Sequence, residues 1–309
     1  MTPTASVIVP THNRPETLDR ALASLAAQEG VEVEAVVVND AGVDVAPVVA
    51  RWSGQLEIRL INQSRNQGLS AARNRGLEDA TGEYTAWLDD DDVFLSGHLK
   101  SMVASLEASG ADVAYASCPV SERRIDPATI TQEEIDGIPY AFDYPFNPDV
   151  LLVTNTLTVH SAVMRSLQGT GAKFDTSLPV QEDWDMWLRL YREYGMQFVH
   201  VPQRTVVYHR PRDFASMTTD PAVAGGNKVF HEGHARLMNR WPVPRDSLAA
   251  TYRPYILEAY NLGASGPVSH FRYERTVKAI YEAMTGKADI ADLHDRLVEA
   301  VRGNILTER

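Results

Sequence analysis

Four consecutive aspartates, Asp89, Asp90, Asp91 and Asp92, directly follow an apolar segment that predicts a buried strand at 84–88. Adjacent carboxylates repel one another and are costly to remove from water. Ligands of open α/β sheets bind beyond the carboxyl ends of the strands. A divalent cation there, Mn²⁺ or Mg²⁺, would neutralise the acids and bridge to phosphate oxygens. The run therefore predicts a cation site, and the alternative is a solvated acidic turn that precedes the next helix.

Two further segments place polar side chains at the same edge of the predicted sheet. Asp40 follows a predicted strand at 35–38, where its carboxylate would accept a hydrogen bond from the ring N–H of a nucleobase. The alternative is a simple turn, because Asn and Asp favour turns. Arg73 and Arg75 lie in a predicted helix at 69–80, where they would donate to phosphate or remain surface arginines.

Acidic residues also gather at the start of a predicted helix at 182–194, where Glu182, Asp183 and Asp185 stand close together. Acids at a helix start are favoured by the helix dipole and by unpaired backbone N–H groups, which gives a purely structural interpretation. The functional interpretation is a carboxylate general base, which must lie within hydrogen-bond reach of the hydroxyl that it deprotonates. Local sequence leaves both interpretations open.

His209 ends a predicted strand at 205–208 and precedes a polar segment at 210–226, for which we predict a lid that orders over a bound substrate. A histidine at that position either reaches a metal or a diphosphate, or is structural. Two further histidines, His231 and His234, are one residue short of the metalloprotease spacing H-E-x-x-H, and we interpret them as surface polar residues.

Short apolar runs alternate with helix-period segments through the first half of the chain, which predicts βαβ units and an α/β fold with a mostly parallel sheet. After residue 227 the pattern is almost wholly helical. The predicted strands lie at 6–9, 35–38, 57–61, 84–88, 112–116, 197–201 and 205–208. The predicted helices lie at 14–28, 69–80, 98–109, 182–194, 228–239, 247–262, 271–284 and 290–302.

The composition is that of a globular protein with a substantial core. The chain has 309 residues, 44% of them hydrophobic, and a formal net charge of −12. That charge argues against broad binding to nucleic acid or to an anionic membrane surface. No apolar stretch approaches the roughly 18 residues of a membrane span, and no signal peptide is evident. Because the single Cys118 suits a reducing compartment, we expect a cytoplasmic protein.

Together these segments resemble the inverting glycosyltransferases of family 2, which have the GT-A fold. The resemblance covers residues 5–210 and excludes the C-terminal helices. It implies transfer of a sugar from a UDP-, GDP- or dTDP-linked donor to a hydroxyl or amine of a glycan, lipid-linked or small-molecule acceptor. The Gln-x-x-Arg-Trp motif of processive, membrane-bound members is missing, which implies a soluble, single-transfer member. The matching segments are SVIVPTHNRPETLDRALASLAAQ, VVVNDAG, NQGLSAARNRGLEDATGEY, WLDDDD, FDTSLPVQEDWDMWLRL and VYHR.

The resemblance also implies roles for individual residues. Asp183 matches the general base, with Glu182 as its neighbour. Asn39 stands where many members have Asp. The implied ligands of the divalent cation, Mn²⁺ or Mg²⁺, are Asp91, Asp89 and His209. The implied donor-binding residues are Pro10, Thr11, His12, Asn13, Arg14, Asp40, Asn66, Arg73, Asp89 and Asp90.

Two other functions are weighed against this one. A catalytically inactive sugar-nucleotide-binding protein would have lost the metal acids or the base, and a sugar-phosphate nucleotidyltransferase would need a glycine-rich loop, which 10–14 is not. We expect a catalytic domain at 1–226, divided into a nucleotide-sugar part at 1–117 and an acceptor and base part at 118–226. The helical extension at 227–309 packs on it, forms a homodimer or contributes to the acceptor pocket.

Overall fold

The computed structural model describes residues 4–211, 227–264 and 271–303. They form two compact units, of which the first contains the described residues up to Pro145 together with 157–176 and 189–211. The second contains 146–156, 177–188 and the C-terminal helices. The domain boundary at 226/227 stays a prediction. The predicted lid lies outside the described residues, apart from its first two positions.

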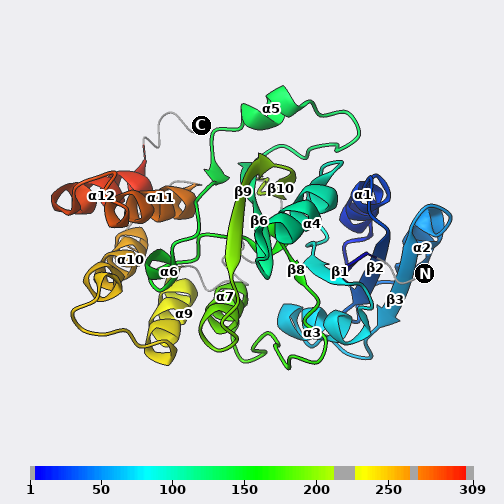
Figure 1. Ribbon diagram of the computed structural model, residues 1–309, viewed down its shortest axis with the longest axis horizontal. Helices are drawn as coiled ribbons and strands as arrows, with labels where there is room; N and C mark the ends of the chain where they lie inside the picture. The colour runs from blue at the N-terminus through cyan, green and yellow to red at the C-terminus, as the bar shows by residue number, and fades with distance from the viewer. Residues whose placement is uncertain (1–3, 212–226, 265–270, 304–309) are drawn as a thin grey trace. The chain divides into compact units, whose positions relative to one another are not determined.

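One sheet forms the centre of the first unit (Figure 1) and has ten strands, counted over the described residues. The strands are β1 (Ala5–Thr11), β2 (Val33–Asn39), β3 (Glu57–Asn62), β4 (Tyr84–Trp87), β5 (Val93–Phe94), β6 (Val113–Ser121), β7 (Ala141–Phe142), β8 (Ala162–Arg165), β9 (Phe198–Arg204) and β10 (Val206–His209). Their order is β3-β2-β1-β4-β8-β6-β10-β5, and β7 and β9 pair with β6. The strands β1 to β4 are mutually parallel, whereas β8 is antiparallel to both β4 and β6.

The register brings the carboxyl ends of three neighbouring strands to one edge of the sheet. Thr11 at the end of β1 pairs with Asn39 at the end of β2, and Ile8 pairs with Trp87 at the end of β4. Every residue of β1 and β4 is buried, in keeping with strands covered on both faces. Asp40 and the aspartate run therefore begin at the same edge, as the sequence predicts.

Helices accompany this sheet, and the sequence predicts those at 15–26, 69–79 and 98–109 but not those at 46–52 and 132–136. They are α1 (Pro15–Ala26), α2 (Ala46–Trp52), α3 (Leu69–Asp79), α4 (His98–Ser109) and the short α5 (Gln132–Asp136). In α1 the proline is at the first turn, and Leu18, Leu22 and Leu25 form the buried stripe. In α3, which packs on β1 and β2, Gly76 lies against Ile8 so closely that any side chain would collide with it.

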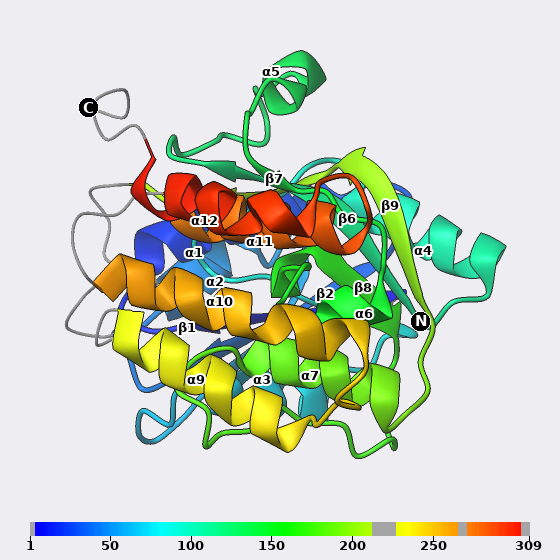
Figure 2. The same cartoon turned by 90° about the vertical axis from the view of Figure 1, so that its left-hand side faces the viewer.

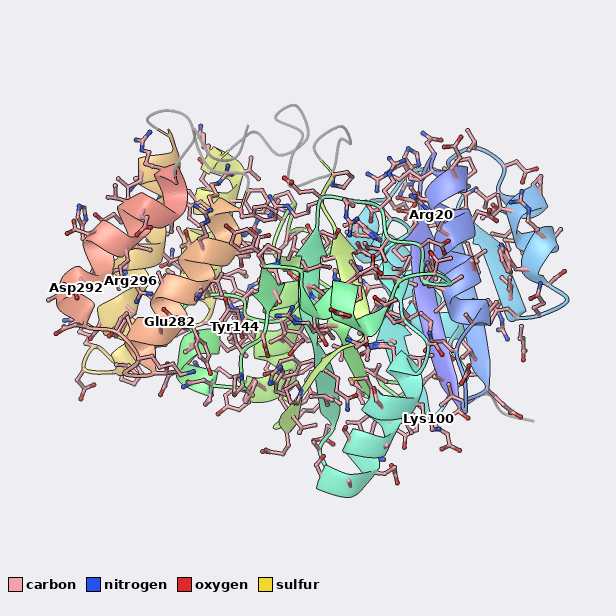
Figure 3. The ribbon with its side chains drawn as sticks, turned by 90° about the horizontal axis from the view of Figure 1, so that it is seen from above. Arg20, Lys100, Tyr144, Glu282, Asp292 and Arg296 are labelled. Carbon is pink, nitrogen blue, oxygen red and sulfur yellow. The ribbon has the colours of Figure 1, made fainter. Side chains whose placement is uncertain are left out.

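The second unit is helical. Its helices are α6 (Pro148–Leu151), the first turns of α7 (Glu182–Arg192), α9 (Asn227–Arg240), α10 (Leu248–Ala264), α11 (Arg272–Met284) and α12 (Leu293–Arg302). Figure 2 shows α9, α10 and the pair formed by α11 and α12 stacked one above another. The last two helices share a buried apolar seam that includes Val277, Ile280 and Leu297, and Glu282 forms an ion pair with Arg296 beside it (Figure 3).

His234 corrects one interpretation from the sequence, because it is completely buried on α9 rather than exposed. Its Nδ1 atom is hydrogen-bonded to the side chain of Gln181, and burial lowers its pKa to about 3, so that the imidazole is neutral. Helix α9 therefore packs through this histidine onto the residue that precedes α7.

Gly82 supplies a stability prediction for the first unit. A Cβ atom at this turn before β4 would lie 2.6 Å from the backbone nitrogen of Ser6 and 2.9 Å from the carbonyl carbon of Ala5. Since backbone atoms of a buried strand cannot move aside cheaply, we expect Gly82→Ala to destabilise the protein by about 1–3 kcal/mol. Gly54→Ala is the control, because no heavy atom lies within 4 Å of its Cβ position. Urea denaturation of both variants measures the effect, and equal midpoints would contradict it.

Candidate active site

The four aspartates at the end of β4 lie in four different environments. The carboxylate of Asp89 accepts a hydrogen bond from the guanidinium of Arg73 at 2.7 Å. The Asp90 Oδ2 atom accepts one from the Thr11 hydroxyl at 2.6 Å. The Arg14 guanidinium contacts two of the acids, Asp90 Oδ1 at 3.3 Å and Asp91 Oδ2 at 3.0 Å. The predicted donor-binding residues Thr11, Arg14 and Arg73 therefore lie together with the aspartate run.

Burial and mutual repulsion raise the pKa of three of these carboxyl groups. Burial and then the charge of Asp91 raise the pKa of Asp90 to about 7, and burial and then the charge of Asp89 raise the pKa of Asp91 to about 6. Burial, with the other aspartates, raises the pKa of Asp92 well above its ordinary value. For Asp89 burial, the largest single effect, acts in the same direction, but Arg73, His160 and Arg14 together outweigh it and lower the pKa. Added positive charge would favour the ionised form of every member of the run.

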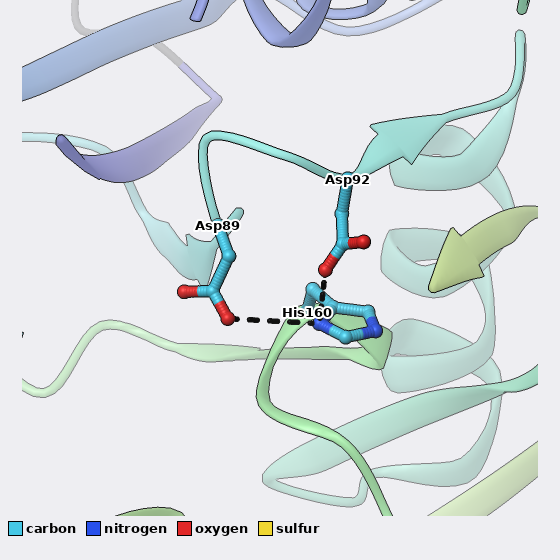
Figure 4. A group of neighbouring side chains, drawn as sticks. All are labelled: Asp89, Asp92 and His160. Atoms are coloured by element: carbon cyan, nitrogen blue, oxygen red, sulfur yellow. Dashed lines mark ion pairs between the residues drawn. The ribbon is translucent and has the colours of Figure 1, made fainter. Parts of the chain in front are cut away.

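The side chains of Asp89, Asp92 and His160 converge on one point (Figure 4). His160 Nδ1 lies 3.0 Å from Asp92 Oδ2 and 4.0 Å from Asp89 Oδ2. Both His160 Nδ1 and Asp92 Oδ2 are buried, and neither has a hydrogen-bond partner among the described residues. Such an orphaned pair is costly unless something else satisfies it.

The separations within this cluster suit one octahedral cation. In a shell with bonds of about 2.1 Å, adjacent ligands are about 3 Å apart and opposite ligands about 4.2 Å apart. His160 Nδ1 and Asp92 Oδ2 are 3.0 Å apart, which is the separation of adjacent ligands. The two atoms are not hydrogen-bonded to each other. Carboxylate oxygens with one imidazole nitrogen are a donor set that Mn²⁺ accepts. The residues present therefore fit a divalent cation.

Cys118 contacts the ring nitrogen of His160 that faces away from Asp92. The Sγ atom of Cys118 lies 3.4 Å from His160 Nε2 and also contacts the backbone oxygen of Pro119 at 3.8 Å. When the thiol donates to Pro119 and accepts from Nε2–H, the lone pair of His160 is on Nδ1 and faces Asp92. Outer partners of this kind set the tautomer of a ligating histidine. Burial also lowers the pKa of His160 to about 4, which keeps the ring neutral.

His209, the histidine that the resemblance implies as a metal ligand, uses both ring nitrogens elsewhere. Its Nδ1–H group donates to the backbone oxygen of Asp91 at 2.7 Å, and its Nε2 atom accepts from the backbone N–H of Ile125 at 3.0 Å. Its own backbone N–H donates to Asp92 Oδ1 at 2.7 Å. The structure thus places His209 next to the aspartate run, where it holds the chain of Asp91 and Asp92 in position.

Asp40 binds the loop that leads into α3. Its Oδ1 atom accepts from Gln63 Nε2 at 3.0 Å and from the backbone N–H of Gln67 at 2.8 Å, and its Oδ2 atom accepts from the backbone N–H of Gly68 at 2.7 Å. Gly68, at φ +88°, is the capping residue directly before this helix. A carboxylate has about four acceptor positions, so three of those on Asp40 are occupied.

Three other predicted donor-binding residues form an exposed group over Asp40. The His12 Nδ1–H group donates to the backbone oxygen of Asp40 at 2.9 Å, and the side-chain amide of Asn13 contacts His12 Nε2 at 3.0 Å. Asn66 Nδ2 lies 3.4 Å from both ring nitrogens of His12. The last of the predicted set, Pro10, is buried within β1. Exposed amides and an imidazole beside a strand end are available to a nucleoside.

Arg73 is held from α3 in a buried position. Its guanidinium lies over the ring of Phe174, 5.3 Å from the centroid, and only 1% of the residue is exposed. The neighbouring Asn74 donates to the backbone oxygen of Phe174 at 2.9 Å and accepts from its backbone N–H at 2.8 Å. Because Arg73 and Asn74 both contact Phe174, the side chain of Arg73 is held in its direction toward Asp89.

In the second unit, the three acids at the start of α7 differ in exposure. Asp185 is 1% exposed and is bound by Arg240 at 3.1 Å and by the indole N–H of Trp241 at 2.8 Å. Glu182 is 8% exposed. Asp183 alone of the three is partly exposed, and its carboxylate accepts from Asn155 Nδ2 and from the backbone N–H of Trp184. Of the three, Asp183 can therefore reach an external proton.

Sequence comparison identifies the family. A model described as "Glycosyl transferase family 2" matches residues 6–165, which include β1 to β8 and the aspartate run. The chain belongs to glycosyl transferase family 2. A relative of this glycosyltransferase in Bacillus subtilis, the uncharacterized glycosyltransferase YwdF, is 31% identical over 209 residues, which are 66% of this chain and 73% of YwdF.

Solved structures share the fold of this family 2 glycosyltransferase. TarS of S. aureus in complex with UDP-GlcNAc has a TM-score of 0.58 at 20% identity, with 96% of this chain and 79% of that chain covered. The mannosyltransferase PcManGT from Pyrobaculum calidifontis, in complex with GDP-Man and Mn²⁺, has a TM-score of 0.59 at 17% identity. The match covers 97% of this chain and 86% of PcManGT. The expected GT-A fold with a helical C-terminal region is confirmed. None of the described helices is both long and apolar enough to cross a membrane.

Proposed function

We propose that this glycosyltransferase uses a divalent cation to move a sugar from a nucleotide-diphosphate sugar to an acceptor hydroxyl or amine, with inversion at the anomeric carbon. The observation that supports this best is the convergence of Asp89, Asp92 and His160 beyond the carboxyl end of β4. In a GT-A fold this edge of the sheet is where a nucleotide would be expected. The complexes of TarS with UDP-GlcNAc and of PcManGT with GDP-Man and Mn²⁺ support the same donor class.

On this proposal, His160, Asp92 and Asp89 hold Mn²⁺ or Mg²⁺. The side chain of Asp89 is 26% exposed, so the cluster has one open side on which diphosphate oxygens can bind. The cation, when bound, offsets the negative charge that develops on the leaving diphosphate. Asp91 and His209 stay the alternative ligands implied by the resemblance, and Mn²⁺ binding by His160 and His209 variants separates the two sets.

The donor is held by the residues around that cluster. Arg14, which contacts Asp90 and Asp91, and the buried Arg73, which contacts Asp89, supply fixed positive charge. Guanidinium groups bind phosphate oxygens with paired N–H donors. His12, Asn13 and Asn66 are exposed above Asp40 and suit the nucleoside end of the donor.

Asp183 acts as the general base. An inverting transfer needs one carboxylate to remove the acceptor proton while the acceptor oxygen or nitrogen attacks the anomeric carbon from the side opposite the leaving group. Asp183 is the partly exposed acid of its helix start, whereas Glu182 and Asp185 are buried. The proton therefore passes from the acceptor to a carboxylate oxygen of Asp183.

The test is release of nucleotide diphosphate from a panel of UDP-, GDP- and dTDP-linked sugars with Mn²⁺ or Mg²⁺. Each donor is assayed with and without glycan, lipid-linked and small-molecule acceptors. We expect release that requires one donor, one acceptor class and a divalent cation, and product anomers identified by NMR should be inverted. Nucleotide binding without acceptor-dependent release across the panel would favour an inactive binding protein. Pyrophosphate formation from a sugar phosphate and a nucleoside triphosphate would favour the nucleotidyltransferase.

A further inference from the structure

The carboxylate of Asp183 accepts a hydrogen bond within its own helix and another from outside it. Its Oδ1 atom accepts from the backbone N–H of the next residue, Trp184, at 2.8 Å. Its Oδ2 atom accepts from the side-chain amide of Asn155 at 2.9 Å. The backbone bond alone leaves the carboxylate free to rotate about it. The Asn155 amide binds the other oxygen and so restrains the plane of the carboxylate.

Asn155 is itself held in place by the C-terminal helices. It is 9% exposed, and its backbone oxygen accepts from the hydroxyl of Tyr273 on α11 at 3.4 Å. The segment that ends at Asn155 is bound at two earlier backbone oxygens. The backbone oxygen of Leu151 accepts from the indole N–H of Trp184 at 2.7 Å. The backbone oxygen of Leu152 accepts from Arg253 Nε on α10 at 2.9 Å.

The backbone at the start of α7 is restrained in a similar way. Gln181, the residue before the helix, has φ +61°, in the left-handed region that a non-glycine residue rarely adopts. Its side chain is bound to His234 of α9, and Gly233 leaves it room, because a Cβ there would lie 2.8 Å from Gln181 Oε1. Strained residues persist where surrounding contacts over-determine them, and they cluster at functional sites.

From these contacts we propose that Asn155 is the positioning residue of the catalytic base, and that α10 and α11 keep it in place. The inference rests on the proposed role of Asp183 as the base. The Asn155 amide stabilises the ionised carboxylate by donating to it, and so holds the acceptor of the proton in one orientation. The C-terminal helices, which the family match does not include, thus act in the transfer step.

The test compares Asn155→Ala and Asn155→Asp with Asn239→Ala, an exposed asparagine on α9. With the donor and acceptor that give the fastest release in the panel above, we expect kcat of Asn155→Ala to fall about 10- to 100-fold, because a base displaced by about 1 Å loses a comparable factor. The KM for the donor should stay unchanged. The acidic limb of the kcat profile should move to higher pH, and further so in Asn155→Asp, which places a second negative charge beside the base.

Two results would overturn the inference. The first is a lower melting temperature with an unchanged pH profile, which is what a merely structural role of Asn155 predicts. The second is a wild-type kcat in a folded Asn155→Ala protein. Tyr273→Phe, which removes one hydroxyl only, provides a second variant and should show a smaller shift of the same limb. Asp183→Asn is measured in parallel. If it keeps wild-type turnover, the proposed base is wrong; if it loses turnover while the Asn155 variants do not, only the positioning role is wrong.

Discussion

Asp183→Asn should lower kcat by about 10²- to 10⁴-fold, the usual contribution of a general base. The replacement is nearly isosteric, and Asn155 still finds an oxygen to which it can donate. Donor binding should be unchanged, because Asp183 is not among the residues proposed to hold the donor. Single-turnover rates measure the chemical step, and calorimetry with UDP or GDP and Mn²⁺ measures binding.

Glu182→Gln is the matched comparison for this variant. Glu182 adjoins the base in sequence but is 8% exposed, so its side chain is not accessible to an acceptor. We expect a loss of turnover of less than about tenfold, because no proton passes through this residue on the proposed mechanism. If Glu182→Gln loses turnover while Asp183→Asn is fully active, Glu182 and not Asp183 is the general base.

His160→Gln should weaken Mn²⁺ binding by at least about 10- to 100-fold, since even the loss of an outer-shell partner of a metal site has an effect of that size. The imidazole is the nitrogen donor of the proposed cluster, and its Nδ1 atom lies 3.0 Å from Asp92 Oδ2. Binding is followed through the EPR signal of free Mn²⁺, with and without UDP or GDP, so the result does not depend on turnover.

His209→Gln is the control that separates the two ligand sets. Both ring nitrogens of His209 have backbone partners, so this variant should bind Mn²⁺ within a few-fold of wild type. If His209→Gln loses the cation and His160→Gln keeps it, the ligands are the set implied by the resemblance, Asp91, Asp89 and His209. Melting temperatures of both variants show whether either change acts through the fold.

Much of the first unit could be predicted because β1 to β4 are short strands with a helix between each one and the next. The helix predicted at 98–109 coincides with α4, and the segment at 84–88 coincides with β4 to within one residue. The aspartate run could be placed because its position depends only on the strand before it. Local pattern and chain order were sufficient for these features.

The strand β8 (Ala162–Arg165) was not predicted, and with it His160 was missed. The α-helices between β6 and this strand, α5 and α6, are short, and its four residues pair antiparallel with β4 and β6 from far along the chain. Nothing local in the sequence marks His160, which stands among apolar and hydroxyl residues. Only the pairing of β8 with β4 brings it to the aspartates, and a long-range pairing of this kind leaves no periodic signal.

Asn155 and Cys118 were missed for a different reason. Each is bound to a functional side chain by one contact, Asn155 to Asp183 at 2.9 Å and Cys118 to His160 at 3.4 Å. Sequence reasoning treated the single cysteine as a statement about redox compartment. A residue that acts by orienting another one has no chemistry of its own by which its sequence position could reveal it.

The interleaving of the two units has a consequence for the order in which a ribosome completes the enzyme. The nascent chain contains Asp89, Asp92 and His160 before it contains α7, and the residues that hold Asn155 in place, Arg253 and Tyr273, are translated later still. Domains tend to fold in the order in which they are made. A partly translated chain therefore acquires the cluster of Asp89, Asp92 and His160 first, and the proposed base is held in position only after Tyr273 has been added.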